Sequence, residues 1–204
     1  PGGVLTRIAS SHIRIGTFEF FSYKNDIKSL KALADYTLKR HFKNAPKKNP
    51  YKFLLKNVLK SQAELISKWM SVGFIHGVMN TDNTTISGET IDFGPCAFMD
   101  QYNPNQVFSY IDEGGRYSYI NQGKIIFWNL AKFAESLLPI LGDNTKESKK
   151  HAMECLEVFP SYFEKIWLNE MKKKIGLSKN EKEDHVILNE FFEILRTNNL
   201  DFTL

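Results

Sequence analysis

The chain has 204 residues, of which 42% are hydrophobic and 25% charged, and this composition excludes intrinsic disorder as its main state. Its formal charge of +4 is spread along the chain without the basic stripe of nucleic-acid-binding proteins, so we expect no nucleic-acid partner. No window approaches the roughly 18 consecutive apolar residues of a membrane span, so we expect no membrane segment. The two cysteines form no CxxC motif, which is typical of a reducing compartment.

The first third of the chain predicts a short strand followed by helices. Apolar alternation over 4–8 predicts the strand, and Ser10 or Ser11 is a candidate N-cap for the helix after it. Helical periodicity over 25–42 predicts a second helix. Asn49-Pro50 then has the pattern of an N-cap followed by proline at the first helical position. The helix that it opens has the clearest apolar face and is expected in the core, through Leu54, Leu55, Val58, Leu59, Leu65, Ile66 and Trp69.

In the middle of the chain the helical periodicity gives way to polar and turn-forming residues. Residues 76–83 are polar and turn-rich, and Ser87-Gly88 is a turn signal that predicts a tight β-hairpin over 84–92. A long loop with aromatic anchors is expected over 95–122. Three helical stretches are predicted after it, over 124–141, over 146–174 with an interruption at Pro160, and over 181–197. The expected fold class is mainly α with a small β-hairpin.

The predicted hairpin brings three polar side chains to its open end. A two-residue loop at Ser87-Gly88 pairs Asn83 with Asp92, and cross-strand neighbours lie about 4.5 to 5.5 Å apart at Cα. This separation suits two oxygen ligands of one hard cation such as Mg²⁺. Asp82 should point the other way, free to accept a proton from a nucleophile. Phosphoryl-transfer sites divide the work in this way, with one carboxylate for the hydroxyl and an Asn and an Asp for the metal.

The DFG tripeptide at 92–94 follows a segment in the place of a kinase catalytic loop. DFG alone also fits an ordinary turn after a strand, but the preceding His, Gly, Asp and Asn residues favour a functional site. The spacing differs from that of an ordinary protein kinase, because Asn83 follows Asp82 directly and does not lie five residues later. We expect His76 to orient this loop by bonding a backbone carbonyl.

That departure from kinase spacing points to a particular family. The stretch HGVMNTDNTTISGETIDFGP closely resembles the selenoprotein O family of kinase-like proteins, together with PGGVLTRIASSHIRIGTFEFF upstream and GRYSYINQGKIIFWNLAKFAESL downstream. The resemblance runs along nearly the whole chain and is densest at 1–21 and 74–141. It implies a single protein kinase-like C-terminal lobe over 1–204, with an arginine pair in 1–21, a catalytic loop and metal-binding hairpin in 74–95, and a helical region in 124–204.

The resemblance implies transfer of AMP, not phosphate, from ATP to Ser, Thr or Tyr hydroxyls of protein substrates, with Mg²⁺ or Mn²⁺ as cofactor. The nucleotide is expected to bind in a flipped orientation, so that its α-phosphate faces the acceptor. By position, Asp82 matches the catalytic base, and Asn83 and Asp92 match the metal ligands. Arg7 and Arg14 match two arginines that hold the outward-turned phosphates, and guanidinium groups suit the charge of a departing pyrophosphate. The implied compartment is a bacterial cytoplasm or a mitochondrion.

Two departures from the family suggest a fragment. The family's small N-terminal lobe should precede Pro1, and its C-terminal Cys-x-x-Sec or Cys-x-x-Cys element does not occur in this sequence, so we expect the isolated chain to be inactive. Two other functions stay open: a conventional kinase-fold phosphotransferase, and a non-catalytic pseudokinase module that binds nucleotide without turnover. The intact set of Asp82, Asn83 and Asp92 argues against the pseudokinase.

Overall fold

The computed structural model of the chain describes residues 2–179 and 181–203, which form a mainly helical fold with one small antiparallel sheet. The predicted fold class is therefore confirmed. The α-helices are α1 (Ile15–Tyr23), α2 (Ile27–His41), α3 (Pro50–Ser71), α4 (Gln122–Leu137), α5 (Thr145–Lys174) and α6 (Asp184–Thr197). Short 3-10 helices lie at η1 (Thr81–Asn83), η2 (Tyr119–Asn121) and η3 (Leu138–Ile140).

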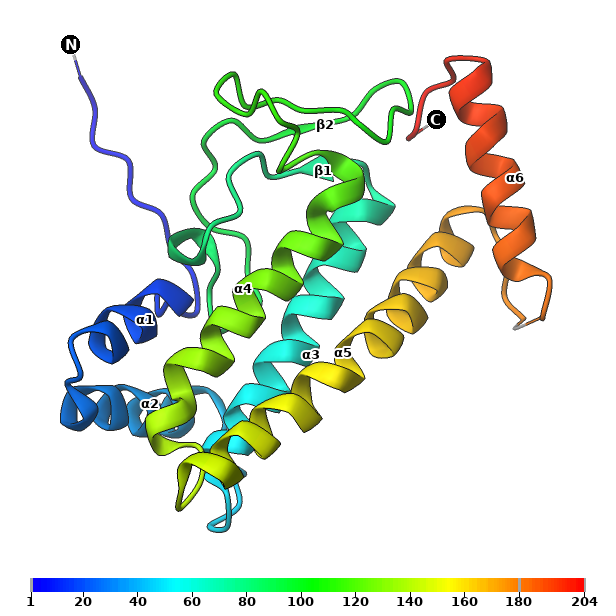
Figure 1. Cartoon of the computed structure of the whole chain (residues 1–204). Helices are drawn as coiled ribbons and strands as arrows, with labels where there is room; N and C mark the ends of the chain where they lie inside the picture. Colours follow the sequence, from blue (N-terminus) through cyan, green and yellow to red (C-terminus); the bar gives the residue numbers. More distant parts are fainter. Residues whose placement is uncertain (1, 180, 204) are drawn as a thin grey trace.

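Three long helices, α3, α4 and α5, run alongside one another and form the body of the molecule (Figure 1). On one side α1 packs against α4 and α2, whereas α6 packs against α5. None of the helices in the described residues combines the length and the apolar character needed to cross a membrane.

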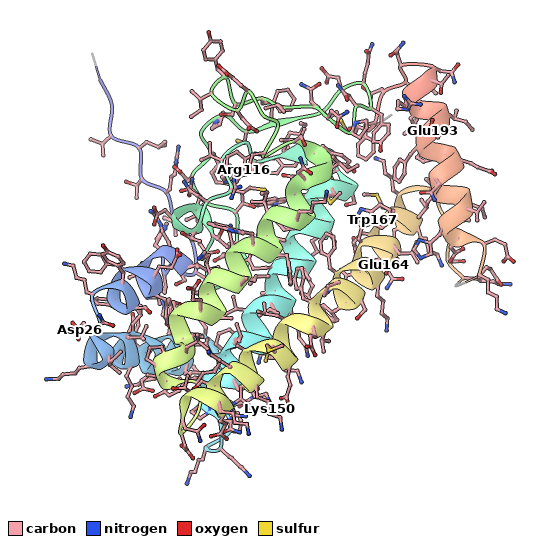
Figure 2. The ribbon with its side chains drawn as sticks, in the orientation of Figure 1. Asp26, Arg116, Lys150, Glu164, Trp167 and Glu193 are labelled. Carbon is pink, nitrogen blue, oxygen red and sulfur yellow. The ribbon has the colours of Figure 1, made fainter. Side chains whose placement is uncertain are left out.

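The predicted apolar stripe of α3 forms the centre of the core. Its members are buried except Leu65, which is half-buried. Pro50 occupies the first position of α3 as predicted, although Asn49 caps the helix without a side-chain hydrogen bond. The N-cap of the preceding helix α2 is Asp26 (Figure 2), whose carboxylate accepts a hydrogen bond from the backbone N–H of Ser29 at 3.0 Å.

The aromatic ring of Phe18 in α1 meets that of Phe133 in α4 edge to face, with the ring centroids 5.0 Å apart. Both side chains are fully buried. Burying a side chain of this size contributes roughly 1.5 to 3 kcal/mol. The contact therefore fixes α1 on α4, and with it the chain segment that enters α1 from the N-terminal side.

The small sheet closes the loop that carries the predicted site. Strands β1 (Phe74–Ile75) and β2 (Ala97–Phe98) pair antiparallel, with Phe74 opposite Phe98 and Ile75 opposite Ala97. The two ends of segment 76–96 are thus held side by side at its base. The strands are short, so most of the loop's order comes from side chains of α3 and α4, described below.

Two β predictions near the N-terminus and the site are wrong. Residues 4–8 form no strand, and Val4 and Ile8 are 99% and 92% exposed. A strand needs a pairing partner, and this segment has none within the described residues. Residues 84–92 form a turn closed by a side chain, because the Thr85 hydroxyl donates to the carbonyl of Glu89 at 2.8 Å and accepts from its N–H at 3.1 Å. The β-ladder lies instead at β1 and β2.

The predicted interruption at Pro160 is also wrong, because α5 is continuous from Thr145 to Lys174. An interior proline costs about 3 kcal/mol through its missing N–H and its ring clash. Pro160 is exposed, whereas Cys155 and Phe159 on the preceding turn are buried. Packing along α3, against which α5 lies for much of its length, offsets the proline's cost.

Candidate active site

The loop after β1 is held by a buried histidine. The Nε2 atom of His76 lies 2.7 Å from the carbonyl oxygen of Ile91, so Nε2 carries the proton of this hydrogen bond. The imidazole also stacks on the indole of Trp69, with the ring centroids 5.3 Å apart. Burial lowers the pKa of His76, which keeps it neutral near pH 7. The predicted carbonyl bond is confirmed, and it ties the start of the loop to the residue before Asp92.

Two buried amide side chains of α4 fix the same loop from the other side. Gln122 accepts from the N–H of His76 at 3.2 Å and donates to the carbonyl of Phe74 at 3.0 Å. Asn129 donates to the carbonyl of Met79 at 3.0 Å and to the Thr84 hydroxyl at 2.8 Å. Sequence reasoning missed both residues. For Asn129 the available signal is a polar side chain on the apolar face of the helix predicted over 124–141, whereas Gln122 falls in the predicted loop before that helix.

Asn83 has a defined orientation at the end of η1. Its Nδ2 donates to the carbonyl of Val78 at 3.0 Å, and its backbone N–H donates to the carbonyl of Asn80 at 3.0 Å. Because the amide nitrogen is engaged in this way, Oδ1 is the atom that Asn83 can offer to a ligand. That orientation suits a hard cation, which prefers oxygen donors.

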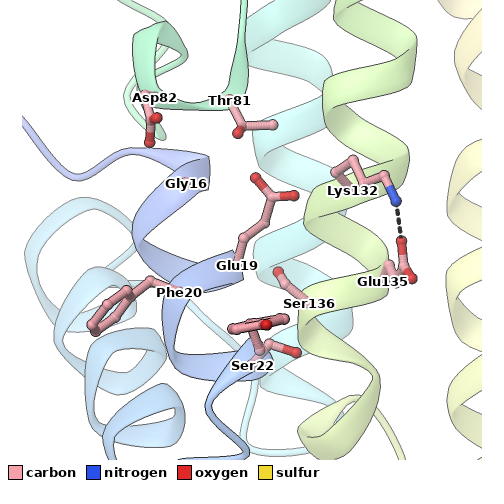
Figure 3. A pocket seen from close by; sticks show the side chains of 10 residues that line it. Gly16, Glu19, Phe20, Ser22, Thr81, Asp82, Lys132, Glu135 and Ser136 are labelled. Atoms are coloured by element: carbon pink, nitrogen blue, oxygen red, sulfur yellow. Dashed lines mark hydrogen bonds and ion pairs between the residues drawn. The ribbon is translucent and has the colours of Figure 1, made fainter.

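Asp82 lies against the first turn of α1. Its carboxylate fills the place where a side chain at Gly16 would start, because a Cβ built there would lie 2.0 Å from Oδ1 (Figure 3). A carboxylate at a helix N-terminus is favoured by the helix dipole, and α1 has no acidic residue of its own in the first turn. Asp82 and Gly16 both line a cavity of about 550 Å³ between α1, η1 and α4, which we call the acidic cavity.

Three other predicted site residues share a second, smaller cavity of about 90 Å³, which we call the arginine cavity. Arg7, Arg14 and Asp92 line it. The Arg7 guanidinium lies 3.9 Å from Oδ1 of Asp92, and both side chains are about half-exposed. Asp92 has φ of 59°, a left-handed conformation that Asp tolerates better than most side chains. The structure thus brings the arginine pair to the DFG aspartate, whereas Asp82 lines the acidic cavity and Asn83 lines neither.

A short antiparallel backbone pairing positions Arg14 at the arginine cavity. Residues 13–15 lie antiparallel to 84–86, through hydrogen bonds from the N–H of Ile15 to the carbonyl of Thr84 at 3.0 Å and from the N–H of Ile86 to the carbonyl of Ile13 at 2.9 Å. Arg14 is therefore the N-cap of α1, and the predicted serine cap is wrong. The hydroxyl of Ser11 instead accepts from the N–H of Ile13 at 3.1 Å.

Glu89 fastens the segment that carries Arg7. Its carboxylate accepts from the backbone N–H of Ser10 at 3.0 Å, from the Ser10 hydroxyl, and from the Ser87 hydroxyl at 2.9 Å. These contacts, led by the Ser10 hydroxyl, lower the pKa of Glu89. Arg40 of α2 also donates to the carbonyl of Ser10, at 2.7 Å. Sequence reasoning missed the contact between Glu89 and Ser10, because 79 residues separate the two.

The donor chemistry of Asn83 and Asp92 fits a divalent cation. Mg²⁺ is commonly bound by one or two protein oxygens together with substrate phosphates, and an amide oxygen and a half-exposed carboxylate supply such donors. In residues 2–179 and 181–203, no three His, Cys, Asp or Glu side chains are grouped to hold a metal by themselves. Convergence of Asn83 and Asp92 on one ion stays a prediction.

Comparison with known protein families shows which family the chain belongs to. A family model described as "Protein adenylyltransferase SelO" matches residues 1–204. The chain belongs to the SelO family. Similar SelO-family relatives are called protein nucleotidyltransferase YdiU: one from Clostridium botulinum strain 657 is 53% identical over 204 residues, and one from Halalkalibacterium halodurans is 55% identical over 205. Each alignment covers 100% of this chain and 42% of the relative, so the chain spans about two fifths of their length.

Proposed function

We propose that the protein is an ATP- and Mg²⁺-dependent adenylyltransferase that transfers AMP to Ser, Thr or Tyr hydroxyls of protein substrates. Membership of the SelO family supports this reaction class. The observation that carries the proposal is the arginine cavity, where Arg7 and Arg14 lie beside the carboxylate of Asp92. Two guanidinium groups next to a carboxylate suit a polyphosphate bound with a cation.

In this reaction, the acceptor hydroxyl gives its proton to the carboxylate of Asp82, and its oxygen attacks the α-phosphorus of ATP. A phosphate ester to AMP forms, the bond to the β-phosphate breaks, and pyrophosphate leaves. Arg7 and Arg14 bind the charge that develops on the leaving group. Asn83 and Asp92 would hold Mg²⁺, which neutralises phosphate charge and acts as a Lewis acid when bound. His76, Gln122 and Asn129 keep the loop in position.

The test uses the complete protein and ATP labelled at the α-phosphate, and we expect label on protein substrates. Asp92→Asn removes the charge while keeping a residue that tolerates the left-handed backbone, so we expect labelling to fall at least 100-fold. Asp143→Asn, at an exposed carboxylate outside both cavities, serves as the matched control.

The position of the label separates this proposal from the other two functions. Transfer of γ-label with no transfer of α-label would assign a conventional kinase reaction. ATP binding with neither label transferred would assign a pseudokinase module. Full activity of Asp92→Asn would contradict the role given to that carboxylate.

A further inference from the structure

The acidic cavity has a composition opposite to that of the arginine cavity. Residues of α1, η1 and α4 line it, and its charged members are three carboxylates and one ammonium group, a net charge of −2. They are Glu19, Asp82, Glu135 and Lys132. The charged members of the arginine cavity are two guanidinium groups and one carboxylate. A polyphosphate is therefore repelled from the first cavity and attracted to the second.

The two cavities adjoin at the start of α1. Arg14 lines the arginine cavity and Gly16 lines the acidic cavity, and two residues of chain span at most about 7 Å. Asp82 lies on the acidic side, against Gly16. A group in the acidic cavity therefore meets the proposed base, while the phosphates stay on the side of the arginines.

With Asp82 assigned as the base, Glu19 is the remaining carboxylate of this cavity that can bind a substrate. Glu135 pairs with Lys132 at 2.8 Å, and this hydrogen bond together with the charge of Glu19 raises the pKa of Lys132. Glu19 itself forms no hydrogen bond or ion pair with another described residue. Its side chain points from α1 toward the space between Thr81 and Lys132 (Figure 3). A cation entering the cavity would find this carboxylate unpaired.

The cavity also has an apolar rim. Phe20 of α1 lines it and is 50% exposed, and Tyr23 at the end of the same helix is 89% exposed. Aromatic side chains beside a carboxylate suit the aliphatic stem and charged head of Lys or Arg better than they suit a small anion. Lys24 lies over the ring of Phe20, 4.3 Å from its centroid, which shows that this aromatic ring attracts a cation.

We propose that the acidic cavity binds the acceptor segment of the protein substrate, and that it selects a hydroxyl residue with Lys or Arg beside it. This inference rests on the proposed adenylyltransferase function. The acceptor hydroxyl lies at Asp82, and the neighbouring basic side chain pairs with Glu19. Glu19 is thus a specificity-determining residue, separate from the groups that bind ATP.

The test compares three synthetic peptides as acceptors for the complete protein, each with one Ser, one Thr and one Tyr. The residues beside these hydroxyls are all Lys, all Gln or all Glu. With ATP labelled at the α-phosphate, we expect kcat/KM to be about two to five times higher for the Lys peptide than for the Gln peptide, which is the scale of a partly exposed ion pair. The Glu peptide should be poorer still.

Variants at position 19 then test whether the preference for the Lys peptide arises from the acidic cavity. Glu19→Gln should abolish the advantage of the Lys peptide, and Glu19→Lys should reverse the order, while the KM for ATP stays unchanged. Glu157→Lys makes the same charge change at an exposed site on α5 and should leave the order intact.

Each outcome separates this inference from the proposed function. Equal labelling of the three peptides, or labelling of proteins with none of the peptides labelled, would overturn the inference and leave the adenylyltransferase proposal standing. An order that Glu19→Gln and Glu19→Lys do not alter would also overturn it. If no acceptor takes up α-label, the proposed function itself fails.

Discussion

Gly16 gives the sharpest test of where Asp82 must lie. The position is helical, so Gly16→Ala should favour α1 by up to about 1 kcal/mol. The new Cβ would nevertheless lie 2.0 Å from Oδ1 of Asp82, whereas ordinary contacts begin near 3.4 Å. The carboxylate must therefore move by about 1.4 Å. Asp82 is exposed and can rotate away without disturbing the core, so folding is preserved while the base is displaced.

The magnitude follows from how strictly a catalytic group must be placed. A misplacement of about 1 Å can cost about 100-fold in rate, so kcat/KM for transfer of α-label should fall by about that factor in Gly16→Ala. The melting temperature should stay equal or rise. Gly114→Ala is the matched control, because a Cβ there meets nothing within 4 Å.

Two outcomes would refute this reasoning. Activity of Gly16→Ala within twofold of the unsubstituted protein would show that catalysis does not need the carboxylate at this position. A large fall in the melting temperature would show that Asp82 cannot rotate freely, so the loss of activity would report on folding and not on the base.

Two other substitutions test how the site is held together. Glu89→Ala releases Ser10 and should raise the KM for ATP by about tenfold, because Arg7 is then no longer held in place. Glu89→Gln keeps an acceptor oxygen and should show a smaller rise in KM. An unchanged KM in both variants would contradict the positioning role of Glu89. Burial lowers the pKa of His76 below 6.5, so unfolding gains a proton there and stability falls as pH drops through about 6.5. In denaturation measured at several pH values, His76→Gln should weaken this dependence of stability on pH. An unaltered slope of unfolding free energy against pH would contradict the role given to His76.

The helices could be predicted from the periodicity of apolar residues, because that periodicity shows which face of a helix is buried. The stripe of α3 needs only the sequence from Pro50 to Ser71 to show its apolar face, and it is buried in the structure. The carbonyl bond of His76 was also predictable, because a histidine at the start of a turn-rich loop needs a partner once it is buried.

Backbone pairing between segments far apart in the chain could not be predicted from the sequence. Alternation over 4–8 and the turn at Ser87-Gly88 both suggest β structure, but a strand forms only where a partner lies beside it. The partner of 84–86 is 13–15, about 70 residues earlier, and it replaces the expected hairpin ladder. The predictions were right about which residues are polar and turn-forming, and wrong about what they pair with.

The opposite charges of the two cavities bear directly on how ATP is oriented. A triphosphate with its terminal phosphates toward Glu19 and Asp82 would place anion against anion, whereas the same phosphates beside Arg7 and Arg14 meet guanidinium groups. The charge pattern alone therefore favours a nucleotide whose β- and γ-phosphates point away from the acceptor. Under the proposed function, that orientation would put the α-phosphorus nearest Asp82, and pyrophosphate would leave on the side of the arginines.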